Sequence, residues 1–328
     1  MKEEGKLLSR GTRRPQSPGR LRPFAEAGSA FNPLRSQAGT HMGSLFELAA
    51  HFAALTEMVC TLSSTTTGKI AENRRQAEGS LIFAKLCLHA LAISRLLPAQ
   101  APRPGIWDLP SVCVLTRVLM ETYYVFFYLC ADIVNQDEEN FRFALWQYHS
   151  EAERLRMLQT FGSRDPRLAE LRHNVEQLKD RLLDDAFYKS LKLSQRRRLR
   201  NGERGLHLTN AELSARARIE PNYYRSVYKL LSQYVHTYSF SISQIAAFRA
   251  DDPQSEIILA TGVDVAVNYL GLAIRDFVTL FPSTQPIVEP VGHLVKLAEE
   301  RVKATANKDP HHDVERFNYM QPGSSGRS

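Results

Sequence analysis

The stretch YYRSVYKLLSQYVHTYSFSI, residues 223–242, decides the fold class. Four of its residues follow one another at four-residue steps: Tyr224, Tyr228, Ser232 and His236. On an α-helix this spacing places side chains along one stripe. The stripe is surrounded by residue types that form cores: Val227, Leu230, Leu231, Val235 and Ile242. Because a buried polar group without a partner costs free energy, we predict a core helix over residues 222–245 whose polar stripe meets partners elsewhere.

Helical periodicity continues through most of the chain. Ser44 followed by Glu47 is a typical helix start, and alternating patterns that would indicate strands are absent. The other predicted helices cover residues 45–62, 71–97, 110–132, 137–161, 167–189, 210–218, 253–281 and 290–304. We therefore predict an all-α fold with a single bundle-like domain over residues 44–306, built around the helices at 110–132, 222–245 and 253–281.

The two ends of the chain differ from this body in composition. Residues 1–41 hold eight Lys and Arg against three Glu, a net charge of +5, so the remaining residues carry only +2 of the total of +7. We predict that residues 1–43 form a disordered basic tail and that residues 307–328 form a disordered C-terminal tail. Met42, where the helical pattern begins, is an alternative start of translation.

The cysteines and the apolar stretches bear on the compartment. No two of the four cysteines form a Cys-x-x-Cys pair, which favours reduced thiols in a cytoplasmic protein. The most apolar stretch, residues 118–131, is shorter than a membrane span, and residues 257–274 contain Asp264 and Asn268. We expect no membrane association, and no motif indicates a cofactor or a metal ion.

The segment CVLTRVLMETYYVFFYLC, residues 113–130, is a second apolar helix that contains charged residues. Arg117 and Glu121 are four residues apart, so they can meet on one face. A buried ion pair adds little net stability, because desolvation offsets the attraction. Its presence therefore indicates either packing specificity or a functional site. In the simpler interpretation, this pair joins Ser232 and His236 in a hydrogen-bonded core network.

These two segments carry a resemblance to known proteins. The residues RVLMET, followed more than a hundred residues later by YYRSVYKLLSQYVHTYS, resemble an uncharacterised family of bacterial all-helical proteins. That family has an Arg-x-x-x-Glu helix and a Tyr-x-x-x-Ser-x-x-x-His helix. The resemblance covers about residues 45–282, and its motif residues are Arg117, Glu121, Tyr228, Ser232 and His236. The family is distantly similar to HEPN-type proteins, many of which are ribonucleases of toxin–antitoxin or phage-defence systems.

The resemblance implies RNA as a partner and a metal-independent ribonuclease as one function. His236 would act as general acid or base, and Arg117 would stabilise the charge of the phosphorane. Ser232 or Tyr228 would orient the phosphate, and Glu121 would fix Arg117.

The HEPN-type signature has Arg and a catalytic His separated by four to six residues, and residues 229–231, which hold the matching positions before His236, contain no Arg. Arg142 with His149 and Arg167 with His173 do fit that spacing, although chance matches are expected in a chain with 10 His.

Two further features suggest nucleic-acid binding. Residues 208–231 resemble a helix-turn-helix with Arg225 and Lys229 on the second helix, but Arg218 stands in the turn where Gly is usual. That helix also continues as a core helix, which makes DNA an improbable partner. A basic run could contact phosphates or form a solvated face: Arg196, Arg197, Arg198, Arg200 and Arg204.

Three functions remain open from the sequence: a helical scaffold with a buried polar centre, a ribonuclease and a nucleic-acid-binding regulator. A homodimer is compatible with each. A ribonuclease requires His236 within hydrogen-bond reach of Arg117 in an open cleft, whereas a scaffold requires both side chains to be sealed.

Overall fold

A computed structural model describes residues 44–97, 107–248 and 253–303. None of these residues lies in a β-strand, so the all-α prediction is confirmed. The predicted tails at residues 1–43 and 307–328 lie outside the described residues, as does Met42.

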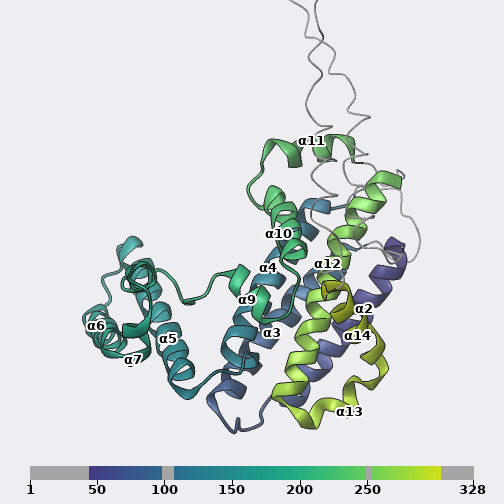
Figure 1. The fold of residues 1–328 in the computed structure, drawn as a ribbon. Helices are drawn as coiled ribbons and strands as arrows, with labels where there is room; N and C mark the ends of the chain where they lie inside the picture. Colours follow the sequence, from purple (N-terminus) through teal and green to yellow (C-terminus); the bar gives the residue numbers. More distant parts are fainter. Residues whose placement is uncertain (1–43, 98–106, 249–252, 304–328) are drawn as a thin grey trace, which may run out of the picture.

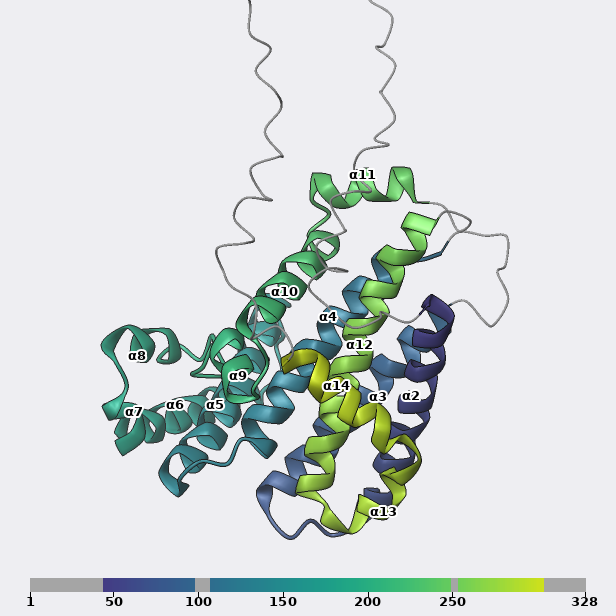
Figure 2. The same cartoon turned by 45° about the vertical axis from the view of Figure 1, so that its right-hand side comes forward.

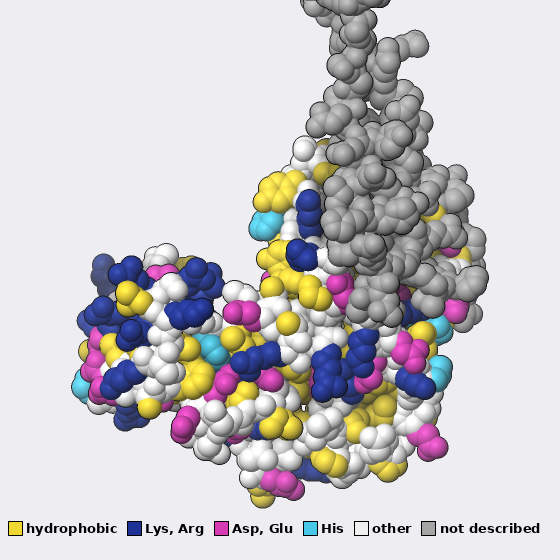
Figure 3. All heavy atoms as spheres, viewed as in Figure 1, with side chains coloured by type: hydrophobic (Ala, Val, Ile, Leu, Met, Phe, Trp, Pro, Cys, Tyr) yellow, Lys and Arg dark blue, Asp and Glu magenta, His cyan; other side chains and the backbone are white. Residues whose placement is uncertain are grey.

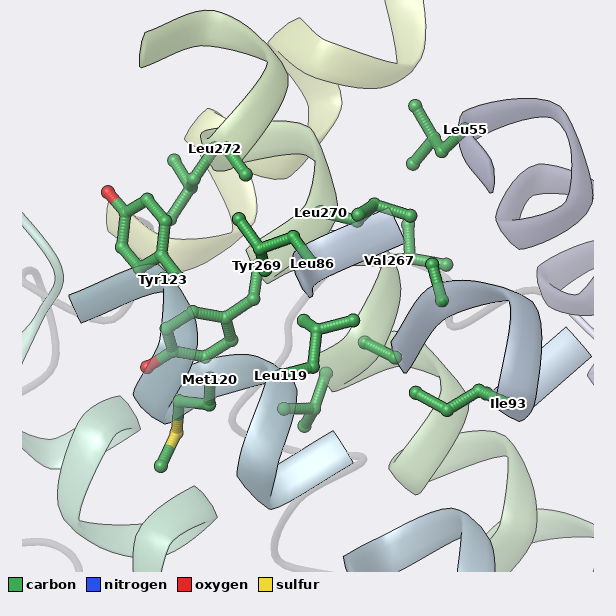
Figure 4. Close-up of a cluster of buried hydrophobic side chains, with 14 of the residues drawn as sticks. Leu55, Leu86, Ile93, Leu119, Met120, Tyr123, Val267, Tyr269, Leu270 and Leu272 are labelled. Atoms are coloured by element: carbon green, nitrogen blue, oxygen red, sulfur yellow. The ribbon is translucent and has the colours of Figure 1, made fainter. Parts of the chain in front are cut away.

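The main bundle is built around one long helix, α12 (Pro253–Leu280), which contacts four others. These are α2 (Leu45–Thr66), α3 (Arg74–Leu96), α4 (Leu109–Phe126) and α14 (Gly292–Lys303). Figures 1 and 2 show α12 running between them. Between α12 and α14 lie short turns of helix: η3 (Pro282–Thr284), α13 (Gln285–Val288) and η4 (Glu289–Val291). Fully buried side chains fill the centre (Figure 4), among them Leu55, Ile93, Leu119 and Leu270.

Side-chain caps explain where these helices begin. The backbone N–H of Glu47 donates to Ser44 Oγ over 3.2 Å, as the sequence predicted. Asn73 and Asp108 accept equivalent bonds at the starts of α3 and α4. Each cap satisfies a backbone donor that has no partner inside the helix.

A π-helical turn, η2 (Phe127–Ala131), extends α4 to the end predicted from the sequence. The backbone N–H of Asp132 donates to Phe127 O over 2.8 Å, five residues back. Such turns are rare and are often found near functional sites. Here the turn directs the chain out of the main bundle.

The chain then forms a side lobe, which Figures 1 and 2 show beside the bundle. It consists of α5 (Gln136–Thr160), α6 (Leu168–Asp184), α7 (Ala186–Ser190) and α8 (Leu193–Leu199). Its own apolar cluster, separate from the main core, includes Phe141, Leu145 and Leu182. The helix predicted at 167–189 is divided at Asp185, whose side chain caps α7.

The chain returns to the bundle through α9 (Asn210–Arg216), α10 (Pro221–Val235) and α11 (Ser239–Ala247). The prediction of one helix over residues 222–245 is wrong at its C-terminal part. Thr237 adopts a φ of 52°, a left-handed conformation that cannot continue an α-helix. His236 is therefore the C-cap of α10, and α11 starts in a new direction.

Four of the described helices are long and apolar enough to cross a membrane, judged by length and composition: Leu45–Thr66, Arg74–Leu96, Leu109–Ala131 and Ser255–Leu280. The sequence analysis predicted the last two helices but counted only residues 118–131 and 257–274 as their apolar stretches. In these two, 72% and 78% of the apolar window is buried inside the protein. The cytoplasmic location therefore stays a prediction.

Candidate functional site

Arg117 of α4 joins α4 to α10 through its guanidinium group. Its Nε and Nη2 donate to Glu121 Oε1 over 3.2 and 2.7 Å. Its Nη1 donates to Ser232 Oγ on α10 over 2.7 Å. The predicted meeting of Arg117, Glu121 and Ser232 is thus confirmed, although its chemical role stays a prediction.

Tyr228 of α10 covers the same guanidinium group. Arg117 Cζ lies 3.5 Å from the centroid of the Tyr228 ring, a cation–π contact that stabilises by about 0.5–2 kcal/mol in proteins. Ser232 Oγ donates to Tyr228 O over 2.6 Å, so the residues of the stripe also hold one another. We call Arg117, Glu121, Tyr228 and Ser232 the Arg117 cluster.

The Arg117 cluster reaches the protein surface. The Arg117 side chain is 10% exposed, whereas that of Glu121 is 46% exposed. Tyr228 is also partly exposed. The prediction of a wholly buried polar centre therefore holds for Arg117 alone. Burial works to lower the pKa of Arg117, but the hydrogen bond with Glu121 and the contact with Tyr228 outweigh it and raise this pKa.

His236 does not join the Arg117 cluster. It is exposed at the C-cap of α10, and its ring lies 5.4 Å from the Tyr238 ring. Among the described residues, no hydrogen bond joins its imidazole to Arg117 or Ser232. His236 still follows Ser232 along α10, since its backbone N–H donates to Ser232 O, but the helix ends there and the side chain is exposed.

A pocket of about 470 Å³ lies next to the Arg117 cluster, between the side lobe and α10. Figure 3 shows the surface hollowed between these two parts. Three parts of the chain line the pocket: His149 of α5, most of residues 203–211, and Tyr224 and Tyr228 of α10. Arg204 and Glu203 bring charge to its rim, and Thr209 and Asn210 bring polar groups.

Two glycines allow the loop after α8 to lie flat on α5. A Cβ added at Gly205 would stand 2.8 Å from His149 Cδ2, and one at Gly202 would stand 2.8 Å from Ala152 Cβ. Gly202 also has a φ of 64°, which suits glycine. Its carbonyl accepts from His149 Nδ1 over 2.8 Å and from Arg156 Nη2 over 2.7 Å. The pocket wall is therefore fixed against α5.

The bond to Gly202 also sets the tautomer of the neutral His149 ring. A carbonyl oxygen only accepts, so Nδ1 carries the hydrogen and Nε2 of the neutral ring is the acceptor. The spacing predicted two Arg–His pairs, Arg142 with His149 and Arg167 with His173. Of these four residues, His149 lines the pocket. Its partner Arg142 is buried away from the pocket, and the exposed Arg167 binds Asp165.

Arg142 belongs to a buried network that attaches the side lobe to the bundle. Its Nη2 binds Glu138 of the same helix and Asp132 at the end of η2. Arg216 of α9 binds the same two carboxylates, Asp132 over 2.8 Å and Glu138 over 3.2 Å. The sequence analysis missed this network, although Glu138 and Arg142 show the same four-residue spacing as Glu121 and Arg117.

His207 extends this network into the pocket-forming loop. Its Nδ1 lies 2.7 Å from the hydroxyl oxygen of Tyr128, and its Nε2 lies 3.7 Å from Glu138 Oε1. Burial, followed by the positive charge of Arg142, lowers the pKa of His207 to about 4. The imidazole is therefore neutral at physiological pH.

The segment that supplies most of the pocket lining is strongly basic. Residues 189–229 contain eleven Lys and Arg against three Glu, a net charge of +8, which exceeds the +7 of the whole chain. Figure 3 shows Lys and Arg side chains clustered on the side lobe. The exposed members include Arg197, Arg198, Arg200, Arg204, Arg225 and Lys229. We call residues 189–229 the basic segment.

The predicted helix-turn-helix corresponds to α9 and α10, and Arg218 in its turn has a φ of 59°. Arg225 and Lys229 are exposed, as a DNA-reading helix would require. However, α10 packs along α4 through its buried face, and two of its tyrosines line the pocket. The helix is part of a concave wall, which does not suit insertion into a groove of DNA.

A family model described as a family of unknown function (DUF5677) matches residues 79–254, more than half of the chain. The matched region contains the Arg117 cluster, the pocket and the basic segment. No curated protein and no solved structure matches the chain.

We expect Glu121→Gln to destabilise the protein more than Arg117→Met. The glutamine leaves a buried guanidinium without its counter-ion, which costs about 1–3 kcal/mol. The methionine fills a similar volume and leaves Glu121 hydrated, so the main loss is the cation–π contact with Tyr228, about 0.5–2 kcal/mol. Urea unfolding of both variants measures this difference. A larger loss for Arg117→Met would contradict it.

Stability should fall between pH 6.5 and pH 4 because of His207. Its folded-state pKa of about 4 lies below the ordinary 6.5, so in that range protons bind the unfolded chain preferentially. The stabilisation is complete above pH 6.5, and about 3 kcal/mol is lost as the pH falls to 4. His207→Gln should remove this part of the pH dependence. Parallel stability–pH curves for the two proteins would show that His207 does not contribute.

Proposed function

We propose, given that the chain belongs to the DUF5677 family of unknown function, that it binds single-stranded RNA in the pocket between the side lobe and α10. The observation that supports this proposal most directly is that positive charge and aromatic side chains occur in the same part of the structure. The segment with a net charge of +8 also forms most of a pocket that two tyrosines line. Cationic grooves with aromatic side chains are the usual means of binding single strands.

Tyr228 is the proposed stacking platform. Its ring is 36% exposed and lines the pocket, while the Arg117 guanidinium holds it from within the protein. Tyr224 supports it with a ring contact at 5.6 Å. A ring that is fixed before binding loses little entropy when a base stacks on it. Base stacking of this kind contributes about 1–3 kcal/mol.

The backbone of the strand would follow the exposed arginines of α8 and the loop after it. Arg197, Arg198 and Arg200 are exposed beside Arg204, which lines the pocket. Arginine contacts with phosphates depend on salt and not on sequence. Thr209 and Asn210 line the pocket as well, and they supply hydrogen-bonding groups suited to a 2′-hydroxyl. A pocket of this volume suits a base splayed from a single strand, not one stacked within a duplex.

A second candidate activity, metal-independent cleavage of the bound RNA, rests on the tautomer of His149. Its Nε2 is the nitrogen that can take a proton from a 2′-hydroxyl, because Nδ1 is bonded to Gly202 O. Arg204 is the pocket cation that would stabilise the phosphorane. This assignment replaces the pairing of His236 with Arg117, which form no hydrogen bond with each other. Such an activity would suit the stress or phage-defence role inferred from the HEPN-like resemblance.

Binding of a fluorescent single-stranded RNA, followed by anisotropy, tests the proposal. Tyr228→Ala should weaken binding about 5- to 100-fold through lost stacking, whereas Tyr228→Phe, which keeps the ring, should bind nearly as wild type. Exchanging Arg197, Arg198 and Arg200 for Gln should lower the slope of log K against log salt by about 2.

The matched control exchanges three exposed cations outside the basic segment, Lys85, Arg95 and Lys296, for Gln. Equal losses in both triple variants, or tighter binding of duplex DNA than of RNA, would exclude the proposed site. Gel analysis of the same RNA reports cleavage. Cleavage products that persist with the His236→Ala variant and vanish with the His149→Ala variant would assign cleavage to the pocket. If the RNA stays intact with the wild type and with both variants, the activity is limited to binding.

A further inference from the structure

The burial pattern of α11 is unusual for a helix at the surface of a protein. Its polar Ser241 is only 2% exposed, and Gln244 is also buried. Ile242, in contrast, is 52% exposed, and Ile245 and Tyr238 are similarly open. A surface helix normally buries its apolar residues and exposes its polar ones. Within the part of the chain that the structure describes, the exposed apolar side chains of α11 therefore lack the cover that such residues usually find.

These apolar residues form one continuous surface. Tyr238, Ile242 and Ile245 follow the spacing i, i+4, i+7 and share one stripe of the helix. Val235, at the end of α10, is exposed close by in the chain. Figure 3 shows apolar side chains gathered over α10 and α11. We call Val235, Tyr238, Ile242 and Ile245 the α11 patch.

The charge around the α11 patch indicates what could cover it. Residues 230–248 are the longest stretch of the chain without Lys, Arg, Asp or Glu. Two copies of the protein repel each other where the basic segment, with its net charge of +8, lies at the surface. At the α11 patch they can approach without bringing like charges together. An uncharged apolar stripe is also self-complementary, as a two-fold symmetric interface requires.

A lipid surface fits the α11 patch less well. Helices that lie on membranes carry Lys or Arg on their polar face, which anchors them to anionic headgroups. The polar residues of α11 are serines and a glutamine. We propose that the α11 patch is the interface of a homodimer, in which the α11 helices of two copies pack against each other.

The dimer would connect two RNA sites without forming part of either. The α11 patch starts at the C-terminal end of α10, whereas the pocket tyrosines lie in the first turn and at the middle of that helix. Each copy would therefore present its own pocket, and His236 would stand at the edge of the interface. The dimer rests on the α11 patch alone and does not depend on RNA binding.

Sedimentation velocity of the full chain without RNA tests the proposal. Because one short helix buries less than most specific interfaces, we expect a dissociation constant of roughly 1–100 µM. Ile242→Glu should shift the protein to monomer over that range, and Ile245→Lys should do the same. Both positions are exposed, so circular dichroism should stay as in the wild type, and so should melting at concentrations where the wild type is monomeric.

The control is Leu88→Glu, which changes a leucine that is 66% exposed on α3 and should leave the dimer intact. A wild-type protein that is monomeric throughout the range would overturn the proposal. So would dimers that persist in both α11 variants, because another surface would then hold the copies together. Binding of the monomer to anionic vesicles, lost in Ile242→Glu, would assign the α11 patch to lipid instead.

Discussion

The pocket depends on one buried guanidinium group. Arg117 lies inside an apolar helix, where each of its N–H groups needs an acceptor. Glu121 supplies one from the same helix, but Ser232 and the face of Tyr228 come from α10. Satisfying Arg117 therefore fixes how α10 lies along α4. We infer that the ion pair specifies this arrangement more than it stabilises it, because desolvation offsets the attraction of buried charges.

A second buried arginine fixes the other side of the pocket, which the side lobe and the loop after α8 form. Arg142 of α5 is held by Glu138 and by Asp132 at the exit of the π-helical turn. Arg216 and His207 bring the returning chain to the same carboxylates. The side lobe, which has its own apolar cluster, is thereby attached beside α10. The pocket therefore lies between α10 and the side lobe. Arg117 positions the first and Arg142 the second, because a buried guanidinium needs a partner.

Local sequence patterns made the packing of α10 on α4 predictable. The attachment of the side lobe depended on contacts between residues distant in sequence. Arg117, Glu121 and Ser232 follow helical spacing, so their meeting could be inferred once both helices were recognised. The position of His236 could not be predicted from the sequence. The helix ends at a left-handed turn at Thr237, where no glycine marks the break. The pocket escaped prediction because the chain after α8 packs on α5, some fifty residues earlier. The basic run at residues 196–204 was visible in the sequence, but its continuation into the wall of a pocket was not.

Photo-crosslinking tests most directly whether this pocket binds RNA. A single-stranded RNA that carries a photoreactive uridine would be irradiated with the full chain, and the modified peptides would be located by mass spectrometry. We predict crosslinks in residues 203–211 and at Tyr224 or Tyr228. The crosslink at Tyr228 should be lost in the Tyr228→Ala variant. Crosslinks confined to α3 and α14, or spread evenly over the exposed cations, would contradict the proposed site.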